Sequence, residues 1–157
     1  MISRQGEIFE INIFLMVLGY SRLKYIKLTT DRTQKTLFKC LVEGFKYIEG
    51  VPKEILFDNM STVVDRSRTT FKNVTINQDF KYFSIDAGFD VITCRPYRPE
   101  TKGKVETLAK LMGRLKPYNE EFDTFEELNT IVEDFNYEIN NEISQATYEI
   151  PFIRFLK

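Results

Sequence analysis

Two acidic residues, Asp58 and Glu106, stand where a metal-dependent active site could form. Asp58 follows the short apolar run 54–57, which is typical of a buried central strand, and ligands of open α/β sheets gather at the carboxyl ends of strands. Glu106 lies on the flank of a predicted helix, beside its apolar side. If that flank faces the strand end, the two carboxylates converge. Paired carboxylates suit hard cations such as Mg²⁺, which activate a water or hydroxyl group and stabilise in-line phosphoryl transfer.

Both acids also have ordinary structural explanations. Asp58 followed by Asn59 is typical of a turn, because both residue types favour turn conformations. Glu106 can pair with Lys102 and Lys110 along one helix face, where each such pair supplies about 0.2–0.5 kcal/mol. The spacing of the two acids does not decide between these alternatives.

The composition narrows the chemistry that is available. The 157 residues contain no His, which excludes Ser–His and Cys–His nucleophilic pairs within them and removes the commonest zinc ligand. Cys40 and Cys94 match no metal-binding spacing and are expected to be small buried apolar residues. Fourteen Phe and no Trp predict a Phe-rich core. Any chemistry must therefore use carboxylates, lysines, hydroxyl groups or a carboxylate-bound metal.

Basic charge is concentrated in one window of the chain, residues 95–116. The net charge of the whole chain is −1, but this window carries +5, so the remainder carries −6. The pattern is compatible with a stripe that faces phosphates and equally with a solvated helix face. The basic residues are Arg95, Arg98, Lys102, Lys104, Lys110, Arg114 and Lys116, against Glu100 and Glu106.

The elements that must position these residues follow from the hydrophobic pattern. Two strands, over 7–18 and 23–29, are predicted to form a hairpin through the turn at 19–22. A helix over about 37–48 is predicted to end at Gly50. The strand 54–57, a short helix closed at Gly88, and a strand over 90–94 follow, giving a mixed α/β pattern.

The second half of the pattern is helical. Pro96 and Pro99 predict an extended loop, and a helix is expected from near Thr101 to just before Pro117. A last long helix opens with Thr124 and Glu127 in capping-box spacing. Its acidic residues are explained most simply by a solvated face, although an ATPase partner or a second protomer could bind there. These acids are Glu126, Glu127, Glu133, Asp134 and Glu138.

Two stretches carry a resemblance to a known family. Residues 57–60, Phe-Asp-Asn-Met, and residues 94–106, Cys-Arg-Pro-Tyr-Arg-Pro-Glu-Thr-Lys-Gly-Lys-Val-Glu, resemble the integrase core of the IstA-type transposases of bacterial insertion sequences. A looser form of the second stretch also resembles retroviral integrases. Further similarity runs through 17–22 and 136–151, so the resemblance covers essentially the whole chain.

The resemblance implies a fold and a site. The fold is an RNase H-like mixed sheet flanked by helices, lacking its first strand, within a single catalytic core domain over 1–157. That domain consists of a core over 1–116 and a C-terminal helical part over 117–157. The implied site is an Asp-Asp-Glu triad that binds two Mg²⁺ or Mn²⁺ ions, in which Asp58 matches the second acid and Glu106 the third. The implied DNA contacts are Arg95, Arg98, Lys102, Lys104 and Lys110, which position DNA through its phosphates.

The sequence departs from the family at the first acid. Residues 1–5 contain no acid, and neither Glu7 nor Glu10 matches the motif, while Asp31 is better explained as a helix cap or dipole partner. We therefore expect the chain to begin after the strand that carries the first acid, and to be inactive or nearly so as it stands.

The resemblance also implies the activity and partners of the parent enzyme, which would cut and join DNA. Its partners would be transposon ends, target DNA, an ATPase helper and further copies of itself. The alternative is a catalytically dead remnant that binds DNA or transposase and inhibits transposition; a general nuclease on the same fold fits the motifs less well. No secretory signal is visible, and the apolar run 11–18 is too short to span a bilayer, which predicts a cytoplasmic protein without membrane contact.

Overall fold

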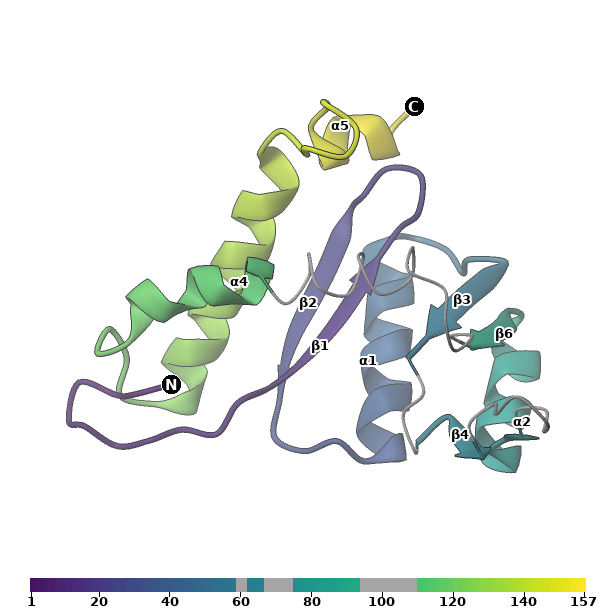
Figure 1. The fold of residues 1–157 in the computed structure, drawn as a ribbon, viewed down its shortest axis with the longest axis horizontal. Coiled ribbons are helices and arrows are strands. Elements are labelled where there is room, and N and C mark those ends of the chain that lie inside the picture. The colour runs from purple at the N-terminus through teal and green to yellow at the C-terminus, as the bar shows by residue number, and fades with distance from the viewer. Residues whose placement is uncertain (59–61, 67–74, 94–109) are drawn as a thin grey trace. The chain divides into compact units, whose positions relative to one another are not determined.

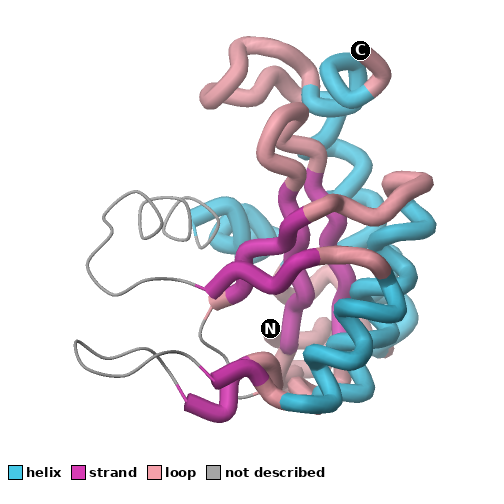
Figure 2. Tube along the Cα trace, turned by 90° about the vertical axis from the view of Figure 1, so that its right-hand side faces the viewer, coloured by secondary structure: helices cyan, strands magenta, loops and turns pink. Residues whose placement is uncertain are grey.

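The computed structural model describes residues 1–58, 62–66, 75–93 and 110–157. Figure 2 draws these residues by their secondary structure and the rest in grey. The chain forms two compact units. We call residues 1–31 with 112–157 the hairpin unit and residues 32–111 the parallel-pair unit, and describe each by itself.

An antiparallel hairpin forms the sheet of the hairpin unit (Figure 1). Strand β1 (Asn12–Val17) pairs with β2 (Lys24–Thr29) in a register that sets Asn12 opposite Thr29 and Val17 opposite Lys24. The backbone N–H of Leu18 donates to the carbonyl of Leu23, which closes the predicted turn. The hairpin is confirmed, but β1 begins at Asn12, later than predicted. Ile8 and Phe9 pair instead with Ile2 and Met1, around a turn in which Gly6 adopts a φ of 82°.

Helix α4 (Phe125–Asn141) packs against β2. It begins as predicted, with the Thr124 side chain accepting a hydrogen bond from the N–H of Glu127. Two buried asparagines on α4 bond to the β2 backbone: the N–H of Ile26 donates to Asn136 Oδ1 at 3.0 Å, and Asn140 pairs with Lys24. The outer edge of β2 is thus partly occupied by side chains of a helix. The short helices η1 (Gly113–Tyr118) and α5 (Pro151–Phe155) also contact α4.

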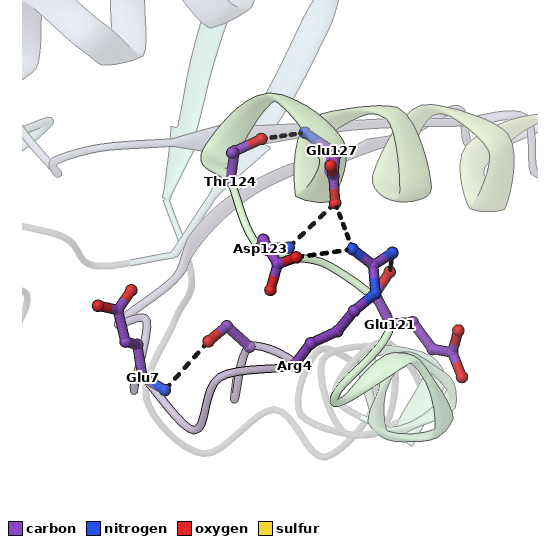
Figure 3. A network of polar contacts seen from close by, with 7 residues as sticks. Arg4, Glu7, Glu121, Asp123, Thr124 and Glu127 are labelled. Carbon is purple, nitrogen blue, oxygen red and sulfur yellow. Dashed lines mark hydrogen bonds and ion pairs between the residues drawn. The ribbon is translucent and has the colours of Figure 1, made fainter.

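The first residues of the chain are tied to the start of α4 (Figure 3). Arg4 Nη1 lies 3.0 Å from Asp123 Oδ2 and 3.1 Å from Glu127 Oε2, while Arg4 Nη2 donates to the carbonyl of Glu121. The backbone N–H of Arg4 also donates to the carbonyl of Phe122 at 2.9 Å. Exposed ion pairs of this kind stabilise a contact by only about 0–1 kcal/mol each. The attachment of residues 1–5 to the start of α4 therefore depends on the ion pairs and the backbone hydrogen bond together.

The parallel-pair unit contains a parallel strand pair, β3 (Glu54–Phe57) with β6 (Asp90–Thr93). An antiparallel pair, β4 (Val64–Arg66) with β5 (Thr75–Ile76), occupies the stretch for which the sequence predicted no element. Parallel and antiparallel pairing are therefore both present, distributed over three two-stranded sheets among the described residues. The helices of this unit are α1 (Gln34–Tyr47) and α2 (Gln78–Ala87), which ends at Gly88 with a φ of 89°.

Phenylalanine rings form the core of the parallel-pair unit, as the composition predicted. Phe80 is fully buried, and its ring meets that of Phe57 edge-on at 5.0 Å. Phe45 contacts Phe89 at 5.8 Å, again edge-on. Each aromatic pair in such geometry contributes about 0.5–1.5 kcal/mol beyond its buried area. The predicted burial of Cys40 is confirmed; Cys94 lies outside the described residues.

The prediction of Asp31 as a helix cap is wrong, and the predicted helix end before Pro117 is incomplete. The N-cap of α1 is Thr33, whose hydroxyl accepts from the N–H of Thr36, and not Asp31, because the helix begins two residues later than an Asp31 cap would require. The α-helical residues 110–112 end before Pro117, as predicted, but the 3₁₀ helix η1 follows them and includes Pro117. A proline disrupts the repeated i→i−4 bonds of an α-helix, but in one short 3₁₀ segment it removes a single donor.

Among the described residues, no helix is both long and apolar enough to cross a membrane.

Candidate active site

Asp58 lies directly after the carboxyl end of β3 and is exposed. The parallel register sets Phe57 opposite Thr93, the last residue of β6. Asp58 therefore stands at the same edge of the sheet as the last residue of β6. This is the edge at which open α/β sheets bind their ligands, as the sequence predicted for Asp58.

Packing of the preceding residue fixes the place of Asp58. The Phe57 side chain is buried against Phe80 and lies 6.2 Å from the ring of Phe89. Successive residues of an extended chain point to opposite sides. The burial of Phe57 therefore leaves the next residue, Asp58, on the exposed side. The other end of the strand pair is held by the N–H of Asp90, which donates to the carbonyl of Lys53 at 2.8 Å.

The other predicted site residues fall mainly outside the described residues. These are Glu106, the proposed second metal ligand, and four of the five proposed DNA contacts, Arg95, Arg98, Lys102 and Lys104. The fifth, Lys110, is described and exposed. Of the predicted site residues, the described part of the chain contains Asp58 and Lys110.

The described part of the chain contains no group of three Asp, Glu, Cys or His residues able to hold a metal ion. It supplies one suitable donor at the predicted site, the Asp58 carboxylate, whose oxygens are the ligands that Mg²⁺ and Mn²⁺ prefer. A complete ligand set must draw on further groups.

A cavity of about 570 Å³ lies at the other end of the strand pair. Asp90, the first residue of β6, lines it, together with Lys53 and Lys81. Asp58, by contrast, follows the last residue of β3. Because the strands are parallel, the cavity and Asp58 belong to opposite ends, so the cavity does not form the predicted site. Its polar groups are also set beside the carboxyl end of α2, whose partial negative charge disfavours an anion.

Arg114, part of the basic window, has its positive charge paired with an acid of the hairpin unit. Its guanidinium binds Glu142 through both Nη atoms, at 2.7 and 2.8 Å, and lies 5.5 Å from the centre of the Phe135 ring. This hydrogen bonding lowers the pKa of Glu142 below its ordinary value. Arg114 therefore contributes less to a phosphate-facing stripe than charge counting suggested.

Lys24 is a group that sequence reasoning missed. Burial, followed by the nearby Arg22, lowers the pKa of its ammonium below the ordinary 10.5, and its Nζ donates to the carbonyl of Arg22 at 3.1 Å. A lysine in an alternating strand gave no signal of this environment, in which the Lys24 backbone also bonds to Asn140 of α4, more than a hundred residues away.

The model of the integrase core domain matches residues 2–99 of the chain, well over half of its length. The chain belongs to the integrase core domain family. Its curated relatives are insertion-sequence transposases, which confirms the resemblance found in the sequence. The transposase of IS232 from Bacillus thuringiensis subsp. berliner is 41% identical over 149 residues, covering 95% of this chain and 34% of that protein. A putative transposase of IS5376 from Geobacillus stearothermophilus is 39% identical over 143 residues, covering 91% and 35%.

More distant relatives agree. The transposase of IS21 from Pseudomonas aeruginosa is 28% identical over 131 residues, covering 83% of this integrase core and 33% of the relative. The chain thus spans about a third of the length of the curated relatives it matches.

Solved structures confirm the fold class. The catalytic core domain of the BIV integrase superposes with a TM-score of 0.67 at 17% identity, covering 93% of this chain and 86% of that one. A chain of the simian T-cell lymphotropic virus intasome, solved in complex with the PP2A regulatory subunit B56 gamma, gives a TM-score of 0.71 at 16% identity, covering 94% and 52%. At this identity the likeness concerns the fold alone. It supports the predicted RNase H-like class of retroviral integrase cores.

Proposed function

We propose that this integrase core contributes Asp58 and Glu106 to a site for metal-dependent DNA cleavage and strand transfer in a transposase. The observation that carries the proposal is the position of Asp58 at the carboxyl end of the parallel pair β3–β6, within the stretch matched by the family model. The names of the curated relatives support the same activity.

The proposed ligands suit a divalent cation. Mg²⁺ or Mn²⁺ bound between carboxylates would activate the attacking hydroxyl group and stabilise the charge on the phosphate. For this chain the proposal assigns Asp58 and Glu106 the task of holding the ion. It assigns the cations of 95–110 the task of orienting DNA through its phosphates. The whole enzyme would act in the cytoplasm on transposon ends and target DNA, with an ATPase helper.

Paramagnetic NMR with Mn²⁺ tests the ligand pair directly. At low Mn²⁺ concentrations, the backbone amide signals of Phe57 and Asp58 and those next to Glu106 should broaden before all others. Asp58→Asn should abolish the broadening at both positions, and Glu106→Gln should do the same. Asp86→Asn, which alters an exposed acid on α2, is the matched control and should change nothing.

The possible outcomes separate the alternatives. Broadening near Asp58 but not near Glu106 contradicts the pairing of these acids, and equal broadening at all exposed acids contradicts a specific site. DNA binding without ion binding would favour the alternative function, a DNA-binding inhibitor of transposition.

A further inference from the structure

The cavity beside the carboxyl end of α2 has the size and the lining of a small-molecule site. Its volume is about 570 Å³, and ligand pockets usually enclose roughly 300–1,000 Å³ between apolar walls with a few polar groups. Ile76 of β5, Ile85 of α2 and Val91 of β6 supply apolar walls here. The charged groups are those of Lys53, Lys81 and Asp90. We call this space the α2 cavity.

Hydrogen bonds hold the backbone around the α2 cavity in place. The carbonyl of Ser84, near the end of α2, accepts from the N–H groups of Gly88 at 2.9 Å and Phe89 at 3.0 Å. The N–H of Asp90 donates to the carbonyl of Lys53 at 2.8 Å. The Phe89 ring is buried and contacts that of Phe45 edge-on. The cavity is therefore largely pre-formed, as small-molecule sites usually are.

The three charged side chains of the α2 cavity are not paired with one another. Lys53, Lys81 and Asp90 are exposed. Within the part of the chain that the structure describes, none of their charged groups forms an ion pair or a hydrogen bond. Opposite charges that line one cavity without pairing keep their hydrogen-bonding capacity for a ligand.

The distribution of charge favours a ligand that carries both signs. The carboxyl end of α2 adds partial negative charge to that of the Asp90 carboxylate, which disfavours a ligand whose only charge is negative. The ammonium groups of Lys53 and Lys81 in turn disfavour a ligand whose only charge is positive. A zwitterion offers its ammonium to Asp90 and its carboxylate to the lysines. Each contact is then a charge-assisted hydrogen bond, the stronger kind.

The apolar walls define the body of the ligand. Ile85 is 64% exposed, and Ile76 and Val91 are half-buried. An apolar side chain placed against these walls removes apolar surface from water on both partners, which a small polar zwitterion cannot do. Charge and walls together select an amino acid with a large apolar side chain.

We propose that the α2 cavity binds a zwitterionic α-amino acid with a large apolar side chain. Its ammonium pairs with Asp90 and its carboxylate with Lys53 and Lys81. The proposal goes beyond the proposed function, since it involves neither Asp58, a metal ion nor DNA. Because the charged groups are exposed and the ligand is small, the dissociation constant should be on the order of 1 mM.

An NMR titration with L-phenylalanine tests the proposal. The backbone amide signals of Ile85, Phe89 and Val91 should shift and saturate, with a dissociation constant on the order of 1 mM. Three simpler probes separate the parts of the ligand. 3-Phenylpropionate lacks the ammonium, phenethylamine lacks the carboxylate, and glycine lacks the apolar side chain. Each should bind at least about tenfold more weakly than L-phenylalanine.

Substitutions at the cavity test the assigned contacts. Asp90→Asn should weaken L-phenylalanine binding at least about tenfold, because the ligand ammonium loses its carboxylate partner. Lys53→Gln with Lys81→Gln should weaken it as much, through loss of the partners of the ligand carboxylate. The matched controls alter exposed charges that do not line the cavity, and should bind like the unmodified chain. These controls are Asp86→Asn on α2 and Lys39→Gln with Lys46→Gln on α1.

Three results would overturn the proposal. The first is an absence of saturable shifts at about twenty times the expected dissociation constant. The second is equal binding of 3-phenylpropionate or phenethylamine, which would show that one of the two charges is irrelevant. The third is unchanged binding in the Asp90 variant or the lysine double variant, with circular dichroism showing that both are folded; the ligand would then bind elsewhere.

Discussion

Asn140, on helix α4, forms the hydrogen bonds that a neighbouring strand normally forms with the edge strand of a sheet. Its Oδ1 accepts from the backbone N–H of Lys24 at 2.8 Å, and its Nδ2 donates to the carbonyl of the same residue at 2.7 Å. The side chain is fully buried. A side-chain amide is the group that can satisfy both a donor and an acceptor of one backbone residue.

Replacing this amide should destabilise the hairpin unit. Asn140→Ala leaves the N–H and the carbonyl of Lys24 without their partner, and each unsatisfied buried group costs about 1–3 kcal/mol. We expect the free energy of unfolding, measured by urea titration with circular dichroism, to fall by about 2–4 kcal/mol. The neighbouring Asn141→Ala is the control, since Asn141 is exposed and bonds only within its own helix. Equal effects of the two substitutions would show that the amide of Asn140 has no special role.

At the scale of elements, helix ends were predictable where the signal is local. Thr124 and Gly88 were recognised because a hydroxyl before an apolar run and a glycine after one act within a few residues. The cap of α1 was misassigned because Asp31 and Thr33 are both good caps, and only the first helical turn decides between them. Strands β4 and β5 were missed, since segments of three and two residues are defined by their pairing rather than by their own pattern.

Asn77 joins three elements of the parallel-pair unit. As the N-cap of α2, its Oδ1 accepts from the N–H groups of Asp79 and Phe80. The same oxygen accepts from Gln34 Nε2 on α1 at 3.0 Å, and Asn77 Nδ2 donates to Asp65 on β4 at 3.0 Å.

Loss of this cap should destabilise the parallel-pair unit. Asn77→Ala removes the helix cap and both side-chain bonds, so we expect a loss of about 1–2 kcal/mol or more in the free energy of unfolding. Asn77→Ser keeps a capping oxygen for α2 but removes the amide that bonds to Asp65, and its loss should be smaller. Gln78→Ala, an exposed neighbour on the same helix, should change stability by no more than about 0.5 kcal/mol. Thermal unfolding of the three variants checks this order, and a harmless Asn77→Ala would contradict the role.

At the scale of the whole molecule, the candidate site was predictable only in part. The position of Asp58 followed from a physical rule, because a buried strand that ends in an acid points to the ligand-binding edge of the sheet. The role of Glu106 rests on the motif at 94–106, since spacing alone left helix pairing with Lys102 and Lys110 equally open.

The uneven charge along the chain leads to a prediction about DNA binding. A net charge of −1 does not oppose binding if the cations of 95–110 contact phosphates as proposed, because each neutralised phosphate releases counterions and steepens the dependence of affinity on salt by about one unit of logarithmic slope. Lys102→Gln with Lys104→Gln should therefore reduce the slope of log K against log salt by about 2. The loss of affinity should be similar for duplexes of unrelated sequence, since phosphate contacts carry no sequence information.

Fluorescence anisotropy of a labelled duplex across a salt series measures both the salt slope and the loss of affinity. Lys53→Gln with Lys81→Gln removes the same charge from the cavity at the opposite end of the strand pair and should leave the slope unchanged. If the two double variants reduce the slope equally, the duplex is held by diffuse charge and residues 95–110 do not form a DNA-binding surface.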